Sequence, residues 1–262
     1  MYKRITMDTL KTKNDGKERK SRMSERKRVR IIFIGFPKFS SVIMNIQMIS
    51  PSVYDSNIYI LNGTVLIDTG MTPEKVIPLI SERTDISKIG RIILTHCHFD
   101  HAGCVDELKK LCGASVVIYD GEEKMMLEDE GSAATVFGYT CPKTMPDVLC
   151  REGDRISAGK NEKGIEEFLE VISTPGHTSG SMCLYSEKEK TVFSGDTVFS
   201  GGGLGRTDFK NSVPEKMTQS IGKLLTRDIE KIYPGHGQAT LKNGKDSLQR
   251  SYRMSEMMNG KE

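Results

Sequence analysis

All five histidines of this 262-residue chain stand in polar or glycine-bearing turns, each after a run of apolar residues. Three of them lie close together in the segment Thr95-His96-Cys97-His98-Phe99-Asp100-His101, and His177 and His236 each follow a Pro-Gly pair. Imidazole and carboxylate groups are the ligands that zinc, iron and manganese accept in proteins. The chain is therefore expected to fold so that the ends of several strands meet around a metal site.

The spacing within the cluster predicts two neighbouring metal sites. In an extended segment, His96 and His98 point to the same side, whereas Asp100 and His101 follow the start of a turn and can face a second site. A carboxylate can lend its oxygens to two cations, which makes Asp196 the natural bridge. Two divalent metal ions are predicted, zinc with iron or manganese as alternatives. The predicted metal ligands are His96, His98, Asp100, His101, His177, Asp196 and His236.

Short apolar segments alternate with helical patterns along the chain, which indicates an α/β fold in one domain. Thr72 is the expected N-cap of a helix that begins at Pro73. The other expected helices cover residues 102–111, 122–130, 214–225 and 245–258. Strands are expected at residues 42–49, 57–61, 65–67, 91–95, 115–119, 168–173, 182–185, 191–193 and 231–233. The stretch 131–146 is rich in loop-forming residues and is expected to cover a site.

Basic residues are concentrated at the amino terminus. Residues 1–30 contain 12 Lys and Arg against 4 Asp and Glu, which leaves 26 against 31 for residues 31–262. Because this segment lacks periodicity, we predict a basic disordered arm over residues 1–30 and a folded domain over residues 31–262. The alternative is contact with nucleic acid or an anionic membrane surface.

The overall composition is typical of a protein that stays in water. Hydrophobic residues make up 37% and charged residues 28% of the chain, and the apolar run at residues 31–36 is too short for a membrane helix or a secretory segment. The six cysteines include no Cys-x-x-Cys pair, so we expect reduced thiols in a cytoplasmic protein. A small-molecule substrate is the expected partner, with no membrane and no nucleic acid, and the oligomeric state is left open.

Five segments of the chain resemble the motifs of the metallo-β-lactamase superfamily, in the same order. They are Leu66-Ile67-Asp68-Thr69-Gly70, residues 95–103, Pro175-Gly176-His177-Thr178, Gly195-Asp196-Thr197 and Pro234-Gly235-His236-Gly237. The resemblance implies a four-layer αββα sandwich. It also implies one ion held by His96, His98 and His177, a second held by Asp100, His101 and His236, and Asp196 between them.

Residues 195–199 and 203–209 resemble the glyoxalase II (hydroxyacylglutathione hydrolase) group, which favours a thioester substrate. Only 26 residues follow His236, so the chain resembles the shorter, single-domain members of that group. Arg206 stands where glyoxalase II has a substrate-contacting lysine. It is expected either to contact an anionic substrate or to form a salt bridge with Asp208.

The expected mechanism uses a metal-bridging hydroxide that attacks the carbonyl, with Asp100 and Asp196 as the catalytic carboxylates. Asp68 closes a different strand and is expected to support the ligands rather than to bind metal. Cys97 and Cys104 are expected to be packing residues.

Three other functions are compatible with these residues. One is a mononuclear iron persulfide dioxygenase that uses His96, His177 and Asp196. The second is a lactone or β-lactam hydrolase. The third, which we favour least, is a non-enzymatic metal-binding or nucleic-acid-associated module suggested by the basic arm.

Overall fold

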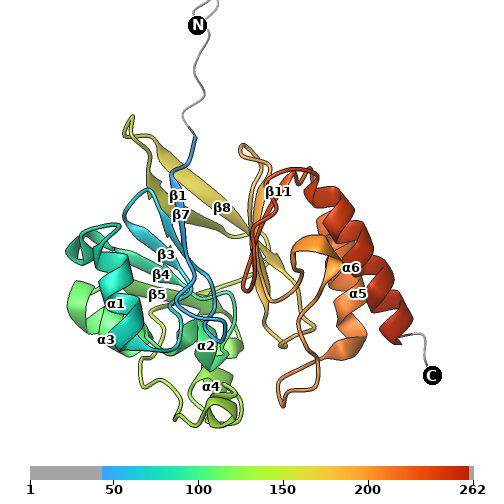
Figure 1. Ribbon diagram of the computed structural model, residues 1–262, viewed down its shortest axis with the longest axis horizontal. Coiled ribbons are helices and arrows are strands. Elements are labelled where there is room, and N and C mark those ends of the chain that lie inside the picture. The colour runs from blue at the N-terminus through green and yellow to red at the C-terminus, as the bar shows by residue number, and fades with distance from the viewer. Residues whose placement is uncertain (1–42, 260–262) are drawn as a thin grey trace, which may run out of the picture. The chain divides into compact units, whose positions relative to one another are not determined.

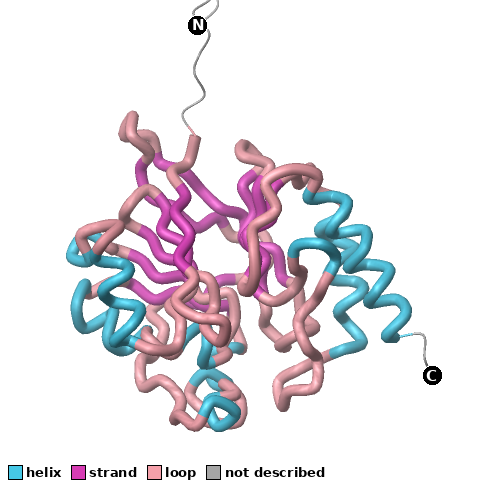
Figure 2. Tube along the Cα trace, viewed as in Figure 1, coloured by secondary structure: helices cyan, strands magenta, loops and turns pink. Residues whose placement is uncertain are grey.

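The structure, a computed structural model, describes residues 43–259, so the predicted basic arm at residues 1–30 lies outside the described residues. The described part contains two β-sheets that pack face to face, with helices on the outer side of each (Figures 1 and 2). This arrangement confirms the predicted four-layer αββα sandwich.

The first sheet has six strands in chain order. Antiparallel pairs join the first three strands and parallel pairs join the third to the sixth. These strands are β1 (Ile46–Ile49), β2 (Ile58–Leu61), β3 (Val65–Ile67), β4 (Arg91–Ile93), β5 (Ser115–Tyr119) and β6 (Val148–Cys150).

The second sheet has five strands in the order β11-β10-β9-β8-β7. Only the β10–β11 pair is parallel. The strands are β7 (Arg155–Lys160), β8 (Glu166–Ser173), β9 (Met182–Ser186), β10 (Thr191–Gly195) and β11 (Lys231–Pro234).

Helices cover the outer faces of the sheets. Figure 1 shows α1 and α3 beside the first sheet and α5 and α6 beside the second. The α-helices are α1 (Pro73–Ser81), α2 (Phe99–Ala102), α3 (Val105–Cys112), α4 (Glu122–Met126), α5 (Met217–Leu225) and α6 (Gly244–Asn259). Four short 3₁₀ helices are η1 (Ile86–Lys88), η2 (Ala134–Phe137), η3 (Ser200–Gly202) and η4 (Pro214–Lys216).

The central strands β5 and β10 carry apolar residues on both faces because both of their faces are buried. Along β5, Val116 and Ile118 pack toward the helices, whereas Val117 points between the sheets. In β10, Val192 faces the helices and Phe193 faces the other sheet. Side chains alternate between the two faces of a strand. Successive residues of an apolar run therefore pack into two different hydrophobic cores.

This layering brings the ends of distant strands together. The motif segment follows β4 directly, and Asp196 and His236 follow the parallel strands β10 and β11. Parallel neighbours end at the same edge of a sheet, where ligands of α/β proteins commonly bind. The edge therefore collects side chains from segments about 140 residues apart.

Two of the predicted helices differ in the structure. The helix predicted over residues 102–111 is split into α2 and α3 at Gly103 and Cys104. A Cβ at Gly103 would collide with the carbonyl oxygen of Phe99, so the chain needs glycine at this tight break. The helix predicted over residues 122–130 ends at Met126.

The predicted start of α1 is confirmed, with Thr72 at the N-cap position and Pro73 as the first helical residue, although the Thr72 side chain makes no capping hydrogen bond. Strands β6 and β7 were not predicted. The β6 residues Val148 and Leu149 are exposed on an edge strand, so β6 lacks the buried apolar run that reveals the other strands.

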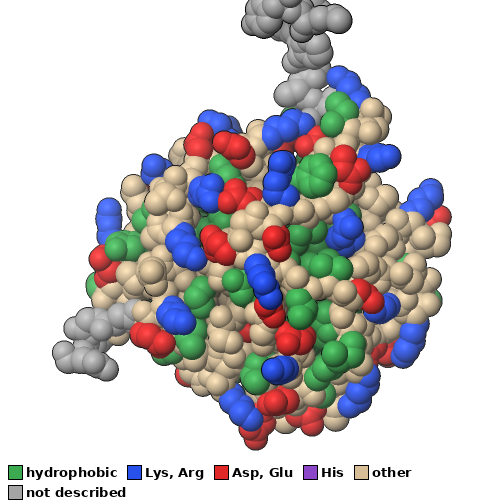
Figure 3. All heavy atoms as spheres, turned by 180° about the vertical axis from the view of Figure 1, so that it is seen from behind, with side chains coloured by type: hydrophobic (Ala, Val, Ile, Leu, Met, Phe, Trp, Pro, Cys, Tyr) green, Lys and Arg blue, Asp and Glu red, His purple; other side chains and the backbone are tan. Residues whose placement is uncertain are grey.

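The surface carries both signs of charge. On the face shown in Figure 3, basic and acidic side chains are interspersed. Among the described residues, no helix is both long and apolar enough to cross a membrane. All six cysteines are free thiols.

Candidate metal centre

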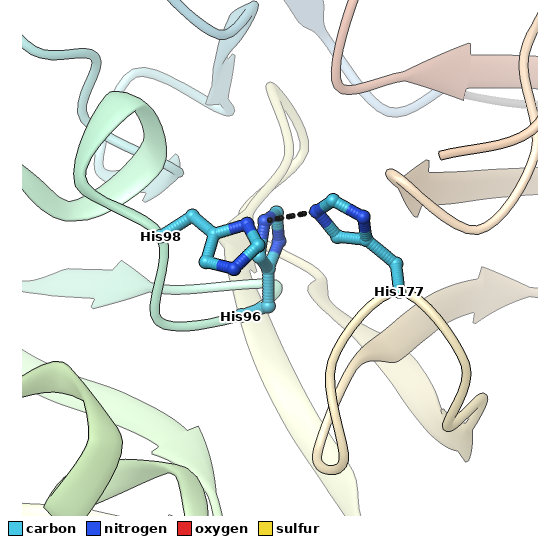
Figure 4. Close-up of side chains that lie close together, drawn as sticks. All are labelled: His96, His98 and His177. Carbon is cyan, nitrogen blue, oxygen red and sulfur yellow. Dashed lines mark hydrogen bonds between the residues drawn. The ribbon is translucent and has the colours of Figure 1, made fainter. Parts of the chain in front are cut away.

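Three imidazoles from two loops converge at the edge of the sheets. His96 and His98 lie in the loop after β4, and His177 lies in the loop between β8 and β9 (Figure 4). The Nε2 atoms of His96 and His177 are 3.2 Å apart, and one nitrogen of each of the three rings lies within 4.8 Å of the others. The predicted first ligand set is thus brought together.

A second group lies beside the first. It consists of Asp100, His101 and His236, whose ligand atoms also lie within 4.8 Å of one another. His236 Nε2 is 3.0 Å from Asp100 Oδ2, and Asp100 and His101 are both carried by α2. The turn predicted after His98 is therefore the first turn of a helix.

Asp196 lies between the two groups. Its carboxylate oxygens are 3.4 Å from His101 Nε2, 3.5 Å from His177 Nε2 and 3.6 Å from His236 Nε2. Gly235 makes this approach possible, because a Cβ at that position would overlap Asp196 Oδ1 and the His101 ring. Asp196 therefore lies within reach of both groups, as the predicted bridging role requires.

These residues fit a metal ion on two grounds. Bonds of about 2.1 Å at a tetrahedral angle separate two ligand atoms by about 3.4 Å, close to the distances around Asp196. In addition, four buried side-chain polar atoms of the described residues have no hydrogen-bond partner, and three of them belong to this cluster. They are His98 Nε2, His101 Nε2 and Asp196 Oδ1. Buried polar atoms are rarely left unpaired, so a cation is the natural partner.

The second ring nitrogens of two histidines are held from outside the cluster. His101 Nδ1 is 2.8 Å from Asp68 Oδ2, and His177 Nδ1 donates to the backbone carbonyl of Arg206 at 2.6 Å. Such bonds orient a metal-binding imidazole and fix which nitrogen faces the metal. Asp68 thus has the supporting position predicted for it.

Asp68 has a left-handed backbone with φ = +58°, which is unusual for a residue other than glycine. Its carboxylate accepts hydrogen bonds from Thr95 N at 2.8 Å and Thr95 Oγ1 at 2.9 Å. A left-handed residue costs about 1–2 kcal/mol, and these bonds offset that cost. The turn at the end of β3 therefore aims one carboxylate at both the motif loop and His101.

Electrostatic effects within the cluster shift the pKa values of its histidines in opposite directions. Burial, together with neighbouring His177, lowers the pKa of His98 to about 3, so its imidazole is neutral at physiological pH. Burial also opposes protonation of His101, but Asp68 and Asp196 outweigh it and raise the pKa of His101. Metal binding is therefore expected to displace a proton from His101.

A pocket of about 250 Å³ opens over the cluster. Its floor includes His98, Asp100 and His236, and its wall carries apolar side chains. The apolar members of the wall are Ala133, Phe137, Phe199, Leu204 and Phe209. Residues 133–137 belong to the stretch that was predicted to cover a site.

Arg206 lines the same pocket. Its guanidinium forms two hydrogen bonds with the Asp208 carboxylate, at 2.9 and 2.7 Å, and lies over the Phe209 ring. The predicted salt bridge is therefore present. The Arg206 backbone carbonyl separately accepts the hydrogen bond from His177. No pattern of side chains in the sequence could have revealed this bond.

Cys97 and Cys104 are both buried. Burial raises the pKa of the Cys104 thiol, and burial with nearby Glu122 raises the pKa of the Cys97 thiol. Neither thiol is ionised at physiological pH, in agreement with the predicted packing role.

The sequence analysis missed several residues that hold the centre together. Asn57 Nδ2 donates to the carbonyls of Pro234 and Gly237 at 2.9 Å, and the Tyr59 hydroxyl donates to Pro234 as well. Glu122 is completely buried beside the motif loop. Asn57 and Tyr59 lie on or next to an apolar strand and Glu122 starts a helix, so each had an ordinary local interpretation.

The fold and the cluster define a class of protein: two packed sheets with histidine and aspartate side chains gathered for metal ions at one edge. Comparison with known proteins makes the class specific. Residues 52–236 match the family model of the Metallo-beta-lactamase superfamily, and the chain belongs to that superfamily.

Known relatives cover most of the described chain. The probable metallo-hydrolase MJ0888 of Methanocaldococcus jannaschii is 33% identical over 71% of this chain and 89% of its own. Hydroxyacylglutathione hydrolase GloC of Haemophilus influenzae is 31% identical over 75% of this chain and 92% of its own. The crystal structure of TTHA1623 in a di-iron-bound form is 29% identical, with a TM-score of 0.62, over 78% of this chain and 96% of that one.

Proposed function

We propose that the protein is a metal-dependent thioester hydrolase with two metal ions in the centre described above. The observation that carries the proposal is the convergence of seven imidazole and carboxylate side chains, five of which line an apolar-walled pocket. The similarity to a hydroxyacylglutathione hydrolase supports a thioester as the substrate class. The proposed ligands are His96, His98, Asp100, His101, His177, Asp196 and His236.

Bound metal ions would supply a Lewis acid and lower the pKa of a water molecule toward neutrality. The side chains of the chain itself perform the remaining tasks. Asp100 faces the pocket and can accept a hydrogen bond from the attacking water, which would orient it toward the carbonyl carbon. No Ser, Cys or Lys is among the described residues that line the pocket, which favours water as the nucleophile.

The chemistry of the pocket suits a thioester. A thiolate is a good leaving group near neutral pH, so no strong general acid is needed, whereas an amide nitrogen requires one. The apolar wall, which includes Phe137 and Phe209, favours an apolar group on the substrate, because burying such a group contributes about 25 cal/mol per Å². We therefore expect acyl thioesters with an apolar acyl group to be better substrates than a hydroxyacyl thioester.

The experiment that tests this function starts with elemental analysis of protein purified without added metal. The same preparation is then assayed on S-lactoylglutathione, a series of acyl-coenzyme A thioesters of increasing chain length, a lactone and a β-lactam. Thioester hydrolysis that stops on chelation and returns with zinc, iron or manganese is expected.

The second candidate activity is tested on the same protein with glutathione persulfide in an oxygen electrode. Iron as the sole metal, together with oxygen consumption and no thioester hydrolysis, would replace the hydrolase proposal by persulfide dioxygenation.

A further inference from the structure

Glu122 is an acidic residue that lies completely inside the protein, at the first position of α4. Its carboxylate accepts hydrogen bonds from backbone and amide N–H groups of three separate segments of the chain, and a longer one, at 3.5 Å, from the Ser179 hydroxyl. A buried carboxylate is expensive unless every acceptor position is used. Its position next to the metal centre therefore calls for a functional explanation.

The first bond reaches the motif loop. Glu122 Oε2 accepts from the backbone N–H of Cys97 at 2.9 Å. Cys97 is the residue between His96 and His98, so this bond fixes the backbone that presents both imidazoles.

The other bonds reach the loops on the second sheet. Glu122 Oε1 accepts from Gly180 N and from Asn211 Nδ2, each at 2.8 Å. Gly180 follows His177 by three residues, and a Cβ at Gly180 would overlap the Glu122 side chain. Asn211 also accepts a hydrogen bond from Ser179 Oγ at 2.7 Å, so it extends the same network.

We propose that Glu122 is a positioning residue that joins the His96–His98 loop to the His177 loop and thereby sets the geometry of the first metal site. The two loops come from different sheets and no other carboxylate bonds to both among the described residues. The Nε2 atoms of His96 and His177, 3.2 Å apart, depend on the relative position of these loops. This inference rests on the proposed function in one respect, namely that the cluster binds metal.

A glutamine cannot replace this carboxylate. Three N–H donors converge on two oxygens, so an amide of the same shape would turn an NH₂ group toward at least one donor. Glu122→Gln is therefore expected to disturb the distance between the loops while leaving the volume of the side chain nearly unchanged. Support of metal ligands from outside the cluster is commonly worth 10–100-fold in affinity.

The test is a titration of the metal-free protein with cobalt(II), followed by its visible absorption spectrum and by competition with a chelator. In Glu122→Gln, the cobalt affinity of one of the two sites is expected to fall about 10–100-fold. The intensities of the cobalt absorption bands are expected to change as well. Asp106→Asn is the matched control, because Asp106 likewise binds two backbone N–H groups but in the loop at Lys143 and Thr144. The control is expected to bind cobalt as the wild type does.

A second variant distinguishes a loss of positioning from a folding defect. Asn211→Ala keeps the carboxylate and removes one of its three N–H donors, and it is expected to weaken cobalt binding in the same direction but by a smaller factor. If both variants bind two cobalt ions with wild-type affinity and spectrum, Glu122 does not position the centre, even if both unfold at lower temperature. Failure of the wild type itself to bind cobalt would instead overturn the proposed function.

Discussion

At the residue scale, hydrogen bonds from outside the cluster orient two of its imidazoles. His101 is oriented by the Asp68 carboxylate and His177 by the Arg206 backbone carbonyl. The remaining nitrogens point into the cluster, and two of the histidines keep an unpaired Nε2 there. Ligands and their supports are therefore separable by mutation.

Removal of a ligand is the first prediction. His98→Ala and Asp196→Ala are each expected to abolish the loading of at least one metal ion and to reduce hydrolysis to background, because Asp196 lies between the two groups and His98 belongs to the first. Metal content is measured by elemental analysis, and the free energy of unfolding of the metal-free proteins controls for misfolding. Wild-type metal content and rates in either variant would contradict the proposed centre.

Removal of a support is the second prediction. Asp68→Asn keeps the shape of the side chain, and asparagine tolerates the left-handed backbone at this position. The variant loses the charge that faces His101 and turns an NH₂ group toward one of the groups that bond to Asp68, so metal affinity is expected to fall about 10–100-fold. The control is Asp55→Asn, a buried carboxylate that binds Met71 N and the Ser52 hydroxyl rather than a histidine. Equal effects of the two substitutions on metal affinity would argue against a specific role for Asp68.

At the element scale, a carboxylate on a helix of the first layer anchors an irregular loop. Asp106 of α3 accepts backbone hydrogen bonds from Lys143 at 2.8 Å and from Thr144 at 2.8 Å. These residues belong to the irregular stretch that follows η2, whose Phe137 lines the pocket. Carboxylates at the ends of helices and in loops thus set the shape of segments that have no regular structure.

A pH dependence follows from this anchor. Burial opposes ionisation of Asp106, but the hydrogen bonds from Thr144 and Lys143 outweigh it and lower the pKa of Asp106. The bonds therefore stabilise the protein above the unfolded pKa of about 3.9, and this stabilisation is lost as pH falls through the lower folded pKa. Asp106→Asn is expected to lower the free energy of unfolding by about 1 kcal/mol at pH 7, and by less near pH 3. Denaturant unfolding at both pH values measures this, and a difference that grows toward acid would contradict the assignment.

At the scale of the whole molecule, the proposed metal centre draws its ligands from both sheets. His96, His98, Asp100 and His101 come from the loop and helix after β4, whereas His177, Asp196 and His236 come from the ends of strands in the second sheet. Ions held by both groups bind only when the sheets are packed together. Metal binding and folding stability should therefore be linked.

Metal removal is the prediction at this scale. A ligand present at about 1,000 times its Kd stabilises the folded state by about 4 kcal/mol, which corresponds to roughly 8–16 °C in Tm for a domain of this size. Differential scanning calorimetry of the protein with and without zinc measures the shift. A Tm that does not change with zinc would show that the sheets pack without help from the centre, and a similar shift in His98→Ala would place the stabilising ion elsewhere.

The sequence by itself determined the layers and the residues that converge. Continuous apolar runs such as residues 115–119 predict strands buried on both faces, and the histidines after such strands predict a site at one edge of the sheets. Both follow from local periodicity and from ligand chemistry, which are properties of neighbouring residues. The exposed edge strand β6 was missed for the same reason, because its side chains carry no burial pattern.

Only the tertiary structure decided what supports those residues. Glu122 lies 25 residues from Cys97, 58 from Gly180 and 89 from Asn211 along the chain, yet bonds to all three. Arg206 was predicted to act through its side chain, but its backbone carbonyl is what holds His177. Periodicity records which face of a segment is buried. It does not record which distant backbone group will lie opposite, because that depends on how the two sheets pack.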